Sequence, residues 1–128
     1  MKKDFPADTT SLFPVREFVR SSAGGVDLRR NELEDVVLAV SDACALLLRH
    51  SLDTVIVLSW EAGKDDILIT VEDRGEVRVW AEESTIRPEE VALISDLIDD
   101  VDIQTMKDTG RTRIRMHKQL GRPGNGTP

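Results

Sequence analysis

Asp42 is the residue of this chain that most strongly indicates chemistry, because it is an acid in the middle of an apolar helical stretch. The stretch, LEDVVLAVSDACALLLRH, covers residues 33–50, and from Val36 to Leu48 only Ser41 and Asp42 interrupt its apolar character. A helix that is apolar around most of its circumference is normally buried on most sides. Burying an unpaired carboxylate costs free energy, so we expect Asp42 to have a partner, a ligand or bound water.

Other side chains with reactive or metal-binding groups are scattered along the chain. His50 and His117 lie on separate predicted elements without a cysteine pair nearby, so a zinc site is not expected. Cys44 is the single cysteine, which excludes an internal disulfide and is typical of an inert buried thiol. The sequence contains no nucleophile elbow, P-loop or dinucleotide fingerprint. Arg113, Arg115 and His117 share one face of a predicted strand, which fits either an acidic partner or a solvated sheet face.

The helix around Asp42 has two sides that differ in composition. One stripe at spacings of three and four is apolar: Leu33, Val37, Val40, Cys44 and Leu47. A second stripe mixes polar and apolar residues: Asp35, Ala39, Asp42, Leu46, Arg49 and His50. The pattern predicts that one side fills a core while the other lines a cavity or a partner surface. The helix is expected to begin at Asp27 or Asn31 and to end near residues 51–53.

The remaining N-terminal elements follow from periodicity and from turn residues. Gly24 and Gly25 are expected to end a first helix, since paired glycines stop helices. A charged, glycine-containing link at residues 61–66 predicts a hairpin. The predicted elements are an edge strand at 2–6, a helix at 11–21, the helix around Asp42, hairpin strands at 54–60 and 67–72, and a short extension at 76–80.

A third helix is predicted to begin at Pro88, because proline and the following Glu89 and Glu90 suit the first turn. Apolar residues at helical spacing extend it: Val91, Leu93, Ile94, Leu97, Ile98 and Val101. Acids would then cover its outside and its end, where they oppose the helix dipole: Asp96, Asp99, Asp100 and Asp102. Solvation or a basic partner would explain them. Residues 81–87 are expected to be loop, and residues 103–106 and 111–118 a last hairpin.

This order of elements predicts an α+β two-layer sandwich, with about three helices on one face of a mixed, mostly antiparallel sheet. The 128 residues suffice for a single core. We expect one domain over residues 1–119 and a disordered tail over residues 120–128. No apolar run approaches the roughly 18 residues of a membrane helix, and no secretory signal is present, so a cytoplasmic protein is expected.

The net charge of the chain limits the classes of partner that we expect it to bind. The net charge is −7 and the pI is about 4.8. An acidic surface repels phosphate backbones and anionic lipid, which argues against nucleic acid and membrane partners. A protein with a basic patch fits better.

Four segments in order resemble the anti-sigma-factor serine kinases, a family that includes RsbW and SpoIIAB and belongs to the GHKL or Bergerat-fold, histidine-kinase-like ATPases. The segments are AVSDACALLLRH at 39–50, ITVEDRGEV at 69–77, LISDLIDDVDI at 93–103 and GRTRIRM at 110–116. The resemblance covers nearly all of residues 5–119. It implies a Bergerat fold, an ATP and Mg²⁺ site, a sigma factor or STAS-domain partner and, often, a homodimer.

The residues that would do the chemistry in this family are unevenly present. Asp42 stands where the family has an acid that acts as base in phosphoryl transfer, and His50 matches a histidine at the helix end. Leu46 stands where the family has an asparagine that helps hold Mg²⁺ and phosphate. Leucine offers no oxygen to a hard cation, so no metal ligand is expected at this position.

The adenine end of the implied pocket is better preserved. Asp73 matches the aspartate that accepts the adenine amino hydrogen, and Gly75 lets the backbone approach the base. Thr112, after Gly110, matches a threonine that helps position adenine, whereas Val77 replaces an expected glycine. Asp-Arg-Gly is also an ordinary turn, so a purely structural role is open.

The phosphate end is the least preserved. The segment from residue 74 to residue 87 is short for a nucleotide lid, and Pro88 and Glu90 replace two glycines at the start of the third helix. Helix N-termini bind phosphate through free N–H groups, and proline removes one of them. Two like charges about 4 Å apart cost about 4 kcal/mol at an effective dielectric of about 20. A carboxylate at residue 90 is therefore expected to exclude phosphate.

Four functions are compatible with these observations. The first is a degenerate anti-sigma-type regulator that binds a sigma factor or a STAS-domain protein without a cofactor. The second is an active serine kinase that uses ATP and Mg²⁺, with Asp42 as general base. The third is an adenine or small-molecule sensor that uses Asp73 and Thr112. The fourth is an unrelated module. The first explains best why scaffold positions survive while Leu46 and Glu90 replace the metal and phosphate groups.

Overall fold

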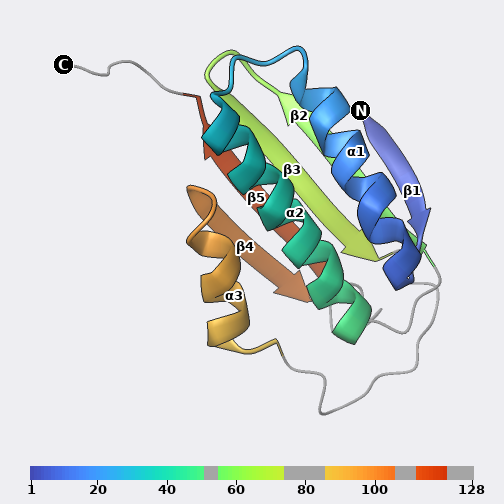
Figure 1. Ribbon diagram of the computed structural model, residues 1–128. Coiled ribbons are helices and arrows are strands. Elements are labelled where there is room, and N and C mark those ends of the chain that lie inside the picture. The colour runs from blue at the N-terminus through green and yellow to red at the C-terminus, as the bar shows by residue number, and fades with distance from the viewer. Residues whose placement is uncertain (51–54, 74–85, 106–111, 121–128) are drawn as a thin grey trace.

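Three helices cover one face of a five-stranded antiparallel sheet in the computed structural model of this chain (Figure 1). The structure describes residues 1–50, 55–73, 86–105 and 112–120. The two layers are those of the predicted α+β sandwich. The sheet was expected to be mixed, but each described strand pairing is antiparallel. No described helix is long and apolar enough to cross a membrane.

The sheet has the strand order β1-β2-β3-β5-β4, so β3 is central and β1 and β4 are its edges. Its strands are β1 (Lys2–Pro6), β2 (Val55–Ala62), β3 (Asp66–Asp73), β4 (Asp100–Thr105) and β5 (Thr112–Gln119). The predicted edge strand and both predicted hairpins are present. Because β5 inserts between β3 and β4, the end of β3 lies beside the start of β5, with Glu72 paired to Arg113.

Acidic side chains accept backbone amides just before the first two helices. A short 3-10 turn (η1, Thr9–Ser11), whose Thr10 amide donates to Asp8 Oδ1 at 2.9 Å, leads into α1 (Leu12–Ala23). The central helix α2 (Arg30–His50) starts one residue before Asn31, and Glu32 accepts the Arg29 amide at 3.0 Å. These helices confirm the two N-terminal helices expected from the sequence. Residues 51–53, where α2 was expected to end, lie outside the described residues.

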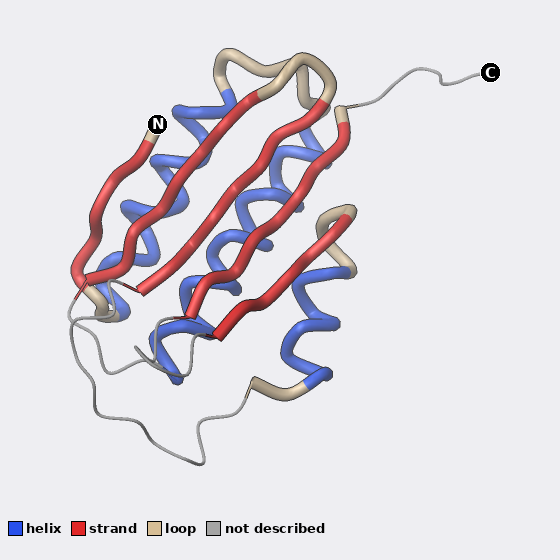
Figure 2. Tube along the Cα trace, turned by 180° about the vertical axis from the view of Figure 1, so that it is seen from behind, coloured by secondary structure: helices blue, strands red, loops and turns tan. Residues whose placement is uncertain are grey.

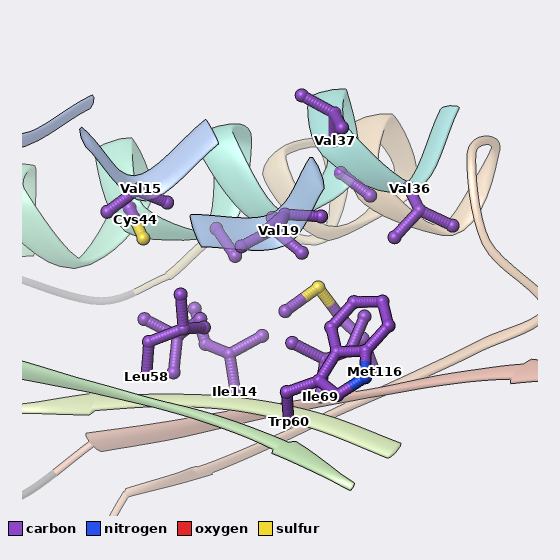
Figure 3. Packing of buried hydrophobic residues seen from close by; sticks show 14 of the residues in the cluster. Val15, Val19, Val36, Val37, Cys44, Leu58, Trp60, Ile69, Ile114 and Met116 are labelled. Atoms are coloured by element: carbon purple, nitrogen blue, oxygen red, sulfur yellow. The ribbon is translucent and has the colours of Figure 1, made fainter. Parts of the chain in front are cut away.

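The core lies between the helix layer and the sheet (Figure 3). Strand residues alternate inward, and the helices contribute their apolar stripes. Buried residues that Figure 3 labels are Val15, Val19, Val36, Val37, Cys44, Leu58, Trp60, Ile69, Ile114 and Met116. Val37, Val40, Cys44 and Leu47 of the predicted apolar stripe are buried, whereas Leu33 is half-buried. One continuous core thus packs α1 and α2 onto the sheet.

The third helix is shorter than predicted. The helix α3 (Pro88–Ser95) starts at the predicted proline, but the chain turns after Ser95 and β4 begins at Asp100. Val101, assigned to the helix from its spacing, instead pairs with Met116 in the sheet. The expectation that four acids crowd the end of this helix was wrong, because Asp99, Asp100 and Asp102 lie beyond it. Strand pairing with β5 overrode the helical periodicity.

Several expectations fall on residues that the structure does not describe. These are the strand extension at 76–80, most of the loop at 81–87, the turn at 107–110 and the tail from 121 to 128. Leu120 is described and packs against the core, with its amide donating to the Asp65 carbonyl at 2.8 Å.

The second face of the sheet carries no described helix (Figure 2). Arg113 Nε donates to Glu72 Oε2 at 3.1 Å, and His117 Nε2 lies 2.8 Å from Asp66 Oδ2. Arg115, between them, is exposed. Two of the three side chains expected to share this face therefore have partners within the sheet.

Ile69 tests how much the central strand contributes to the core. Ile69→Ala is expected to lower the free energy of unfolding by about 2–5 kcal/mol, because a fully buried side chain leaves a cavity. Leu93→Ala is a matched control, since Leu93 is 64% exposed, and should change stability by less than about 0.5 kcal/mol. Urea unfolding followed by circular dichroism measures both, and equal losses would contradict this core.

Candidate functional site

The predicted site residues gather at one end of the molecule. There α2 and β3 end while α3 and β5 begin (Figure 1). The antiparallel sheet brings Asp73 beside the start of β5, and packing of α3 on α2 brings Glu90 beside the end of α2. Gly75, Val77 and Gly110 lie outside the described residues, as does the side chain of His50, the last residue of α2.

Asp73 and Thr112, the two residues that the resemblance assigned to the adenine end, lie in contact. Asp73 is 3% exposed, and the Thr112 amide donates to its two carboxylate oxygens at 3.2 and 3.3 Å. The contact joins the last residue of β3 to the first residue of β5. A buried carboxylate held in this way is a fixed acceptor at the rim of the sheet.

Asp42 is half-buried on the outer side of α2. Burial raises the pKa of the Asp42 carboxyl above its ordinary value, while the positive charges of Arg16 and Arg49 act to lower it. Neither arginine is within ion-pair distance: Arg16 Nε donates to Ser41 Oγ at 3.0 Å, and Arg49 bonds to Glu90. Within the described part of the chain, Asp42 has neither a hydrogen-bond partner nor an ion-pair partner. The acid singled out by the sequence is thus partly desolvated and open to an external partner.

Leu46, one turn after Asp42, is part of the core. It is 1% exposed and belongs to the same buried cluster as Ile94 of α3. The second stripe of α2 was expected to line a cavity or partner surface, and this was wrong for two of its members. Ala39 and Leu46 are buried, whereas Asp35 and Arg49 are exposed. Part of this side of α2 therefore belongs to the core.

Glu90 closes the start of α3 with its own carboxylate. Its Oε1 accepts the Arg87 amide at 3.0 Å, and its Oε2 accepts from Arg49 Nη2 at 2.9 Å. The Glu90 amide itself donates to the Arg87 carbonyl at 3.0 Å. Pro88 lies in the first turn and has no N–H to donate. The positive end of the helix dipole therefore faces a carboxylate of the same chain, which is favourable there.

Sequence reasoning missed the ion pair between Arg49 and Glu90 and the hydrogen bond between Arg16 and Ser41. Their residues are 41 and 25 positions apart, so no local spacing reveals them. The capping role of Glu90 could have been predicted from the sequence, because a glutamate three residues after the N-cap forms one half of a capping box.

Other candidate sites offer less. The described residues contain no group of three histidine, cysteine or acidic side chains that could hold a metal. Burial raises the pKa of the Cys44 thiol to about 12, which makes it a poor nucleophile. A cavity of about 320 Å³ lies at the other end of the molecule, between Gly25, Gly63 and Leu120. It is remote from Asp42 and Asp73.

The fold and the clustered ends of α2, β3, α3 and β5 define a two-layer α+β domain. Residues 5–118 match the histidine kinase-like ATPase domain family, and the chain belongs to that family. This supports the GHKL resemblance drawn from the motifs.

A solved structure with the same fold is the crystal structure of the RsbU and RsbW domains of Rv1364c from Mycobacterium tuberculosis. The two superpose with a TM-score of 0.70 at 18% sequence identity, covering 100% of this chain and 35% of that one. This chain therefore spans about a third of the length of its structural neighbour. No curated protein matches the chain.

Glu90→Ala tests the carboxylate that closes α3. We expect a loss of about 1–2 kcal/mol in the free energy of unfolding, because the variant loses a helix cap and an ion pair. Glu90→Gln keeps an oxygen for the cap and should lose less than about 1 kcal/mol. Glu89→Ala is the control, since Glu89 is exposed in the same turn. Equal effects at 89 and 90 in chemical denaturation would contradict this role.

Asp42→Asn tests the partly desolvated acid. The folded-state pKa of Asp42 is raised above its ordinary value of 3.8, so the folded protein binds this proton more tightly than the unfolded chain does. The free energy of unfolding therefore falls as pH rises from the unfolded-state pKa to the folded-state pKa. The variant should be more stable than wild type at pH 7, by less than about 1 kcal/mol. The difference should vanish below the unfolded-state pKa. Denaturation midpoints from acidic to neutral pH measure it, and a variant less stable at neutral pH would contradict the sign.

Proposed function

We propose that this chain is a regulatory protein that binds another protein and works without nucleotide. The partner we propose is a sigma factor or a STAS-domain antagonist of an anti-sigma factor, so the output would be control of transcription. The observation that carries the proposal is the pair of side chains at the phosphate end. Leu46 is buried in the core and Glu90 caps α3.

The first step concerns magnesium. Mg²⁺ takes oxygen ligands almost exclusively, and the family position that supplies one is here a leucine with 1% exposure. An oxygen cannot be presented from this position without exchanging a core side chain. The metal therefore lacks the ligand that α2 would provide.

The second step concerns phosphate. A phosphate at the start of α3 would need the helix amides and the positive end of the dipole. Glu90 already accepts the Arg87 amide and pairs with Arg49, the nearby cation on α2. Its negative charge would also repel the ligand. The chain thus supplies its own anion where the family would bind one.

The family match, the structural neighbour and the net charge support a protein partner. The histidine kinase-like ATPase domain family matches the chain from residue 5 to residue 118. The structural neighbour is a chain with RsbU and RsbW domains, and RsbW is a member of the anti-sigma kinase family that the motifs resemble. A net charge of −7 favours a basic surface on the partner.

An ATP-dependent serine kinase is the second candidate, and two observations favour it. Asp42 has a raised pKa, as a general base requires, and the Asp73–Thr112 pair is in place at the adenine end. In that case Asp42 would orient the serine hydroxyl of an anti-anti-sigma partner. Leu46 and Glu90 weigh against this candidate.

Calorimetry separates the two candidates. We expect no Mg²⁺-dependent heat when ATP is titrated into the protein at up to millimolar concentration. Adenosine alone probes the Asp73 end, and Asp73→Asn is the control for any heat that it gives. Tight ATP binding that requires Mg²⁺ would refute the proposed loss of nucleotide binding and favour the kinase.

Co-elution tests the partner. The protein is mixed with sigma factors and STAS-domain proteins of the same genome and passed over a sizing column, with and without ATP and Mg²⁺. We expect a complex whose dissociation constant nucleotide does not change. A complex that forms only with ATP would contradict the proposal.

A further inference from the structure

We propose that the outer face of α2 and α3 is the docking surface of this protein, and that its occupant is an amphipathic helix of the partner. That helix would place a lysine or arginine against Asp42, between two apolar side chains that contact Leu38 and Leu93. This inference rests on the proposed function, because it assumes that the chain works by binding a protein.

The apolar contacts are two leucines that the fold leaves in solvent. Leu38 on α2 is 47% exposed and Leu93 on α3 is 64% exposed. The other large hydrophobic side chains exposed among the described residues are Met1 at the chain end and Phe13 on α1. Removing apolar surface from water is the dominant favourable term in most protein association. Leu38 and Leu93 are therefore suitable anchors.

The spacing of these residues fits a helix. The helices α2 and α3 lie side by side and run in opposite directions (Figure 1), with Arg49 bonded to Glu90 at 2.9 Å. With a rise of about 1.5 Å per residue, Leu93, Asp42 and Leu38 lie about 4.5, 10.5 and 16.5 Å from the level of that pair. A partner helix presents side chains at i, i+4 and i+7 over a similar length.

The charge on this face favours a basic occupant. Asp42 has no hydrogen-bond or ion-pair partner among the described residues, and Arg49, a nearby cation, is held by Glu90. The exposed acids nearby on the two helices are Asp35, Glu89 and Asp96. A cation from the partner would pair with the Asp42 carboxylate, which is already partly desolvated. Pairing therefore costs less further desolvation than it would for a fully solvated acid.

The open face of the sheet is a weaker candidate. Several of its ionic side chains pair with each other, as Arg113 does with Glu72 and His117 with Asp66. None of the large exposed hydrophobic side chains among the described residues lies in a strand of the sheet. It therefore offers no large exposed apolar anchor among the described residues.

A synthetic peptide probes the surface directly. The probe is a helix-forming peptide with leucine, arginine and leucine at i, i+4 and i+7, and its control has glutamate in place of arginine. We titrate each into ¹⁵N-labelled full-length protein and follow the amide spectrum. We expect the amide signals around Leu38, Asp42 and Leu93 to shift with the arginine peptide and not with the glutamate control. Absence of shifts, shifts around Arg115 or Phe13, or equal binding of both peptides would overturn the proposal.

Variants then test the named residues. Asp42→Asn and Leu93→Ser should each weaken binding of the arginine peptide by about tenfold, which corresponds to about 1.4 kcal/mol. Phe13→Ser is the matched control, since Phe13 is 67% exposed on α1, and should bind as wild type does. Unchanged binding by the first two variants, with folded spectra, would overturn the assignment.

The two proposals can fail separately. Mg²⁺-dependent ATP binding in the same samples would refute the nucleotide-free function and leave the peptide map standing. A peptide that binds elsewhere would refute the docking surface without changing the conclusion on nucleotide binding from calorimetry. Where a co-eluting protein has been found, the same three variants should reproduce their order of effects on that complex.

Discussion

One carboxylate connects the parts of this molecule that decide its function. Glu90 caps α3 through the Arg87 amide and pairs with Arg49, which lies 41 positions away on α2. The two contacts place the start of α3 against the end of α2. They also put a negative charge where the fold family would accept a phosphate. The position of α3 and the negative charge at its start therefore have the same physical origin.

Leu46 belongs to the core on the same helix as Arg49. It shares one buried cluster with Ile94 of α3, and a leucine at this position adds to the packing. Asp42, one turn earlier, stays at the boundary between core and water, where its carboxylate is partly desolvated. The helix α2 is mostly a packing element, and Asp42 is a partly desolvated acid at its outer side.

Much of the fold was predictable because its signals are local. Alternation in residues 55–73, the apolar stripe of α2 and the proline at the start of α3 each depend on neighbours in sequence. The end of α3 was not predictable in this way. Leu97, Ile98 and Val101 fit a helical spacing, yet the first two belong to a turn and Val101 pairs with Met116 on β5. Distant hydrogen bonds decided between the two structures.

The sequence by itself determined the fold class, the family, the acid at position 42 and the leucine at position 46, because these depend on residue type and short-range spacing. Tertiary structure alone decided which side of α2 is buried, that Asp73 meets the Thr112 amide, and that Glu90 pairs with Arg49. These contacts join residues about 40 positions apart. Their geometry is determined by strand order and helix packing, which no local pattern encodes.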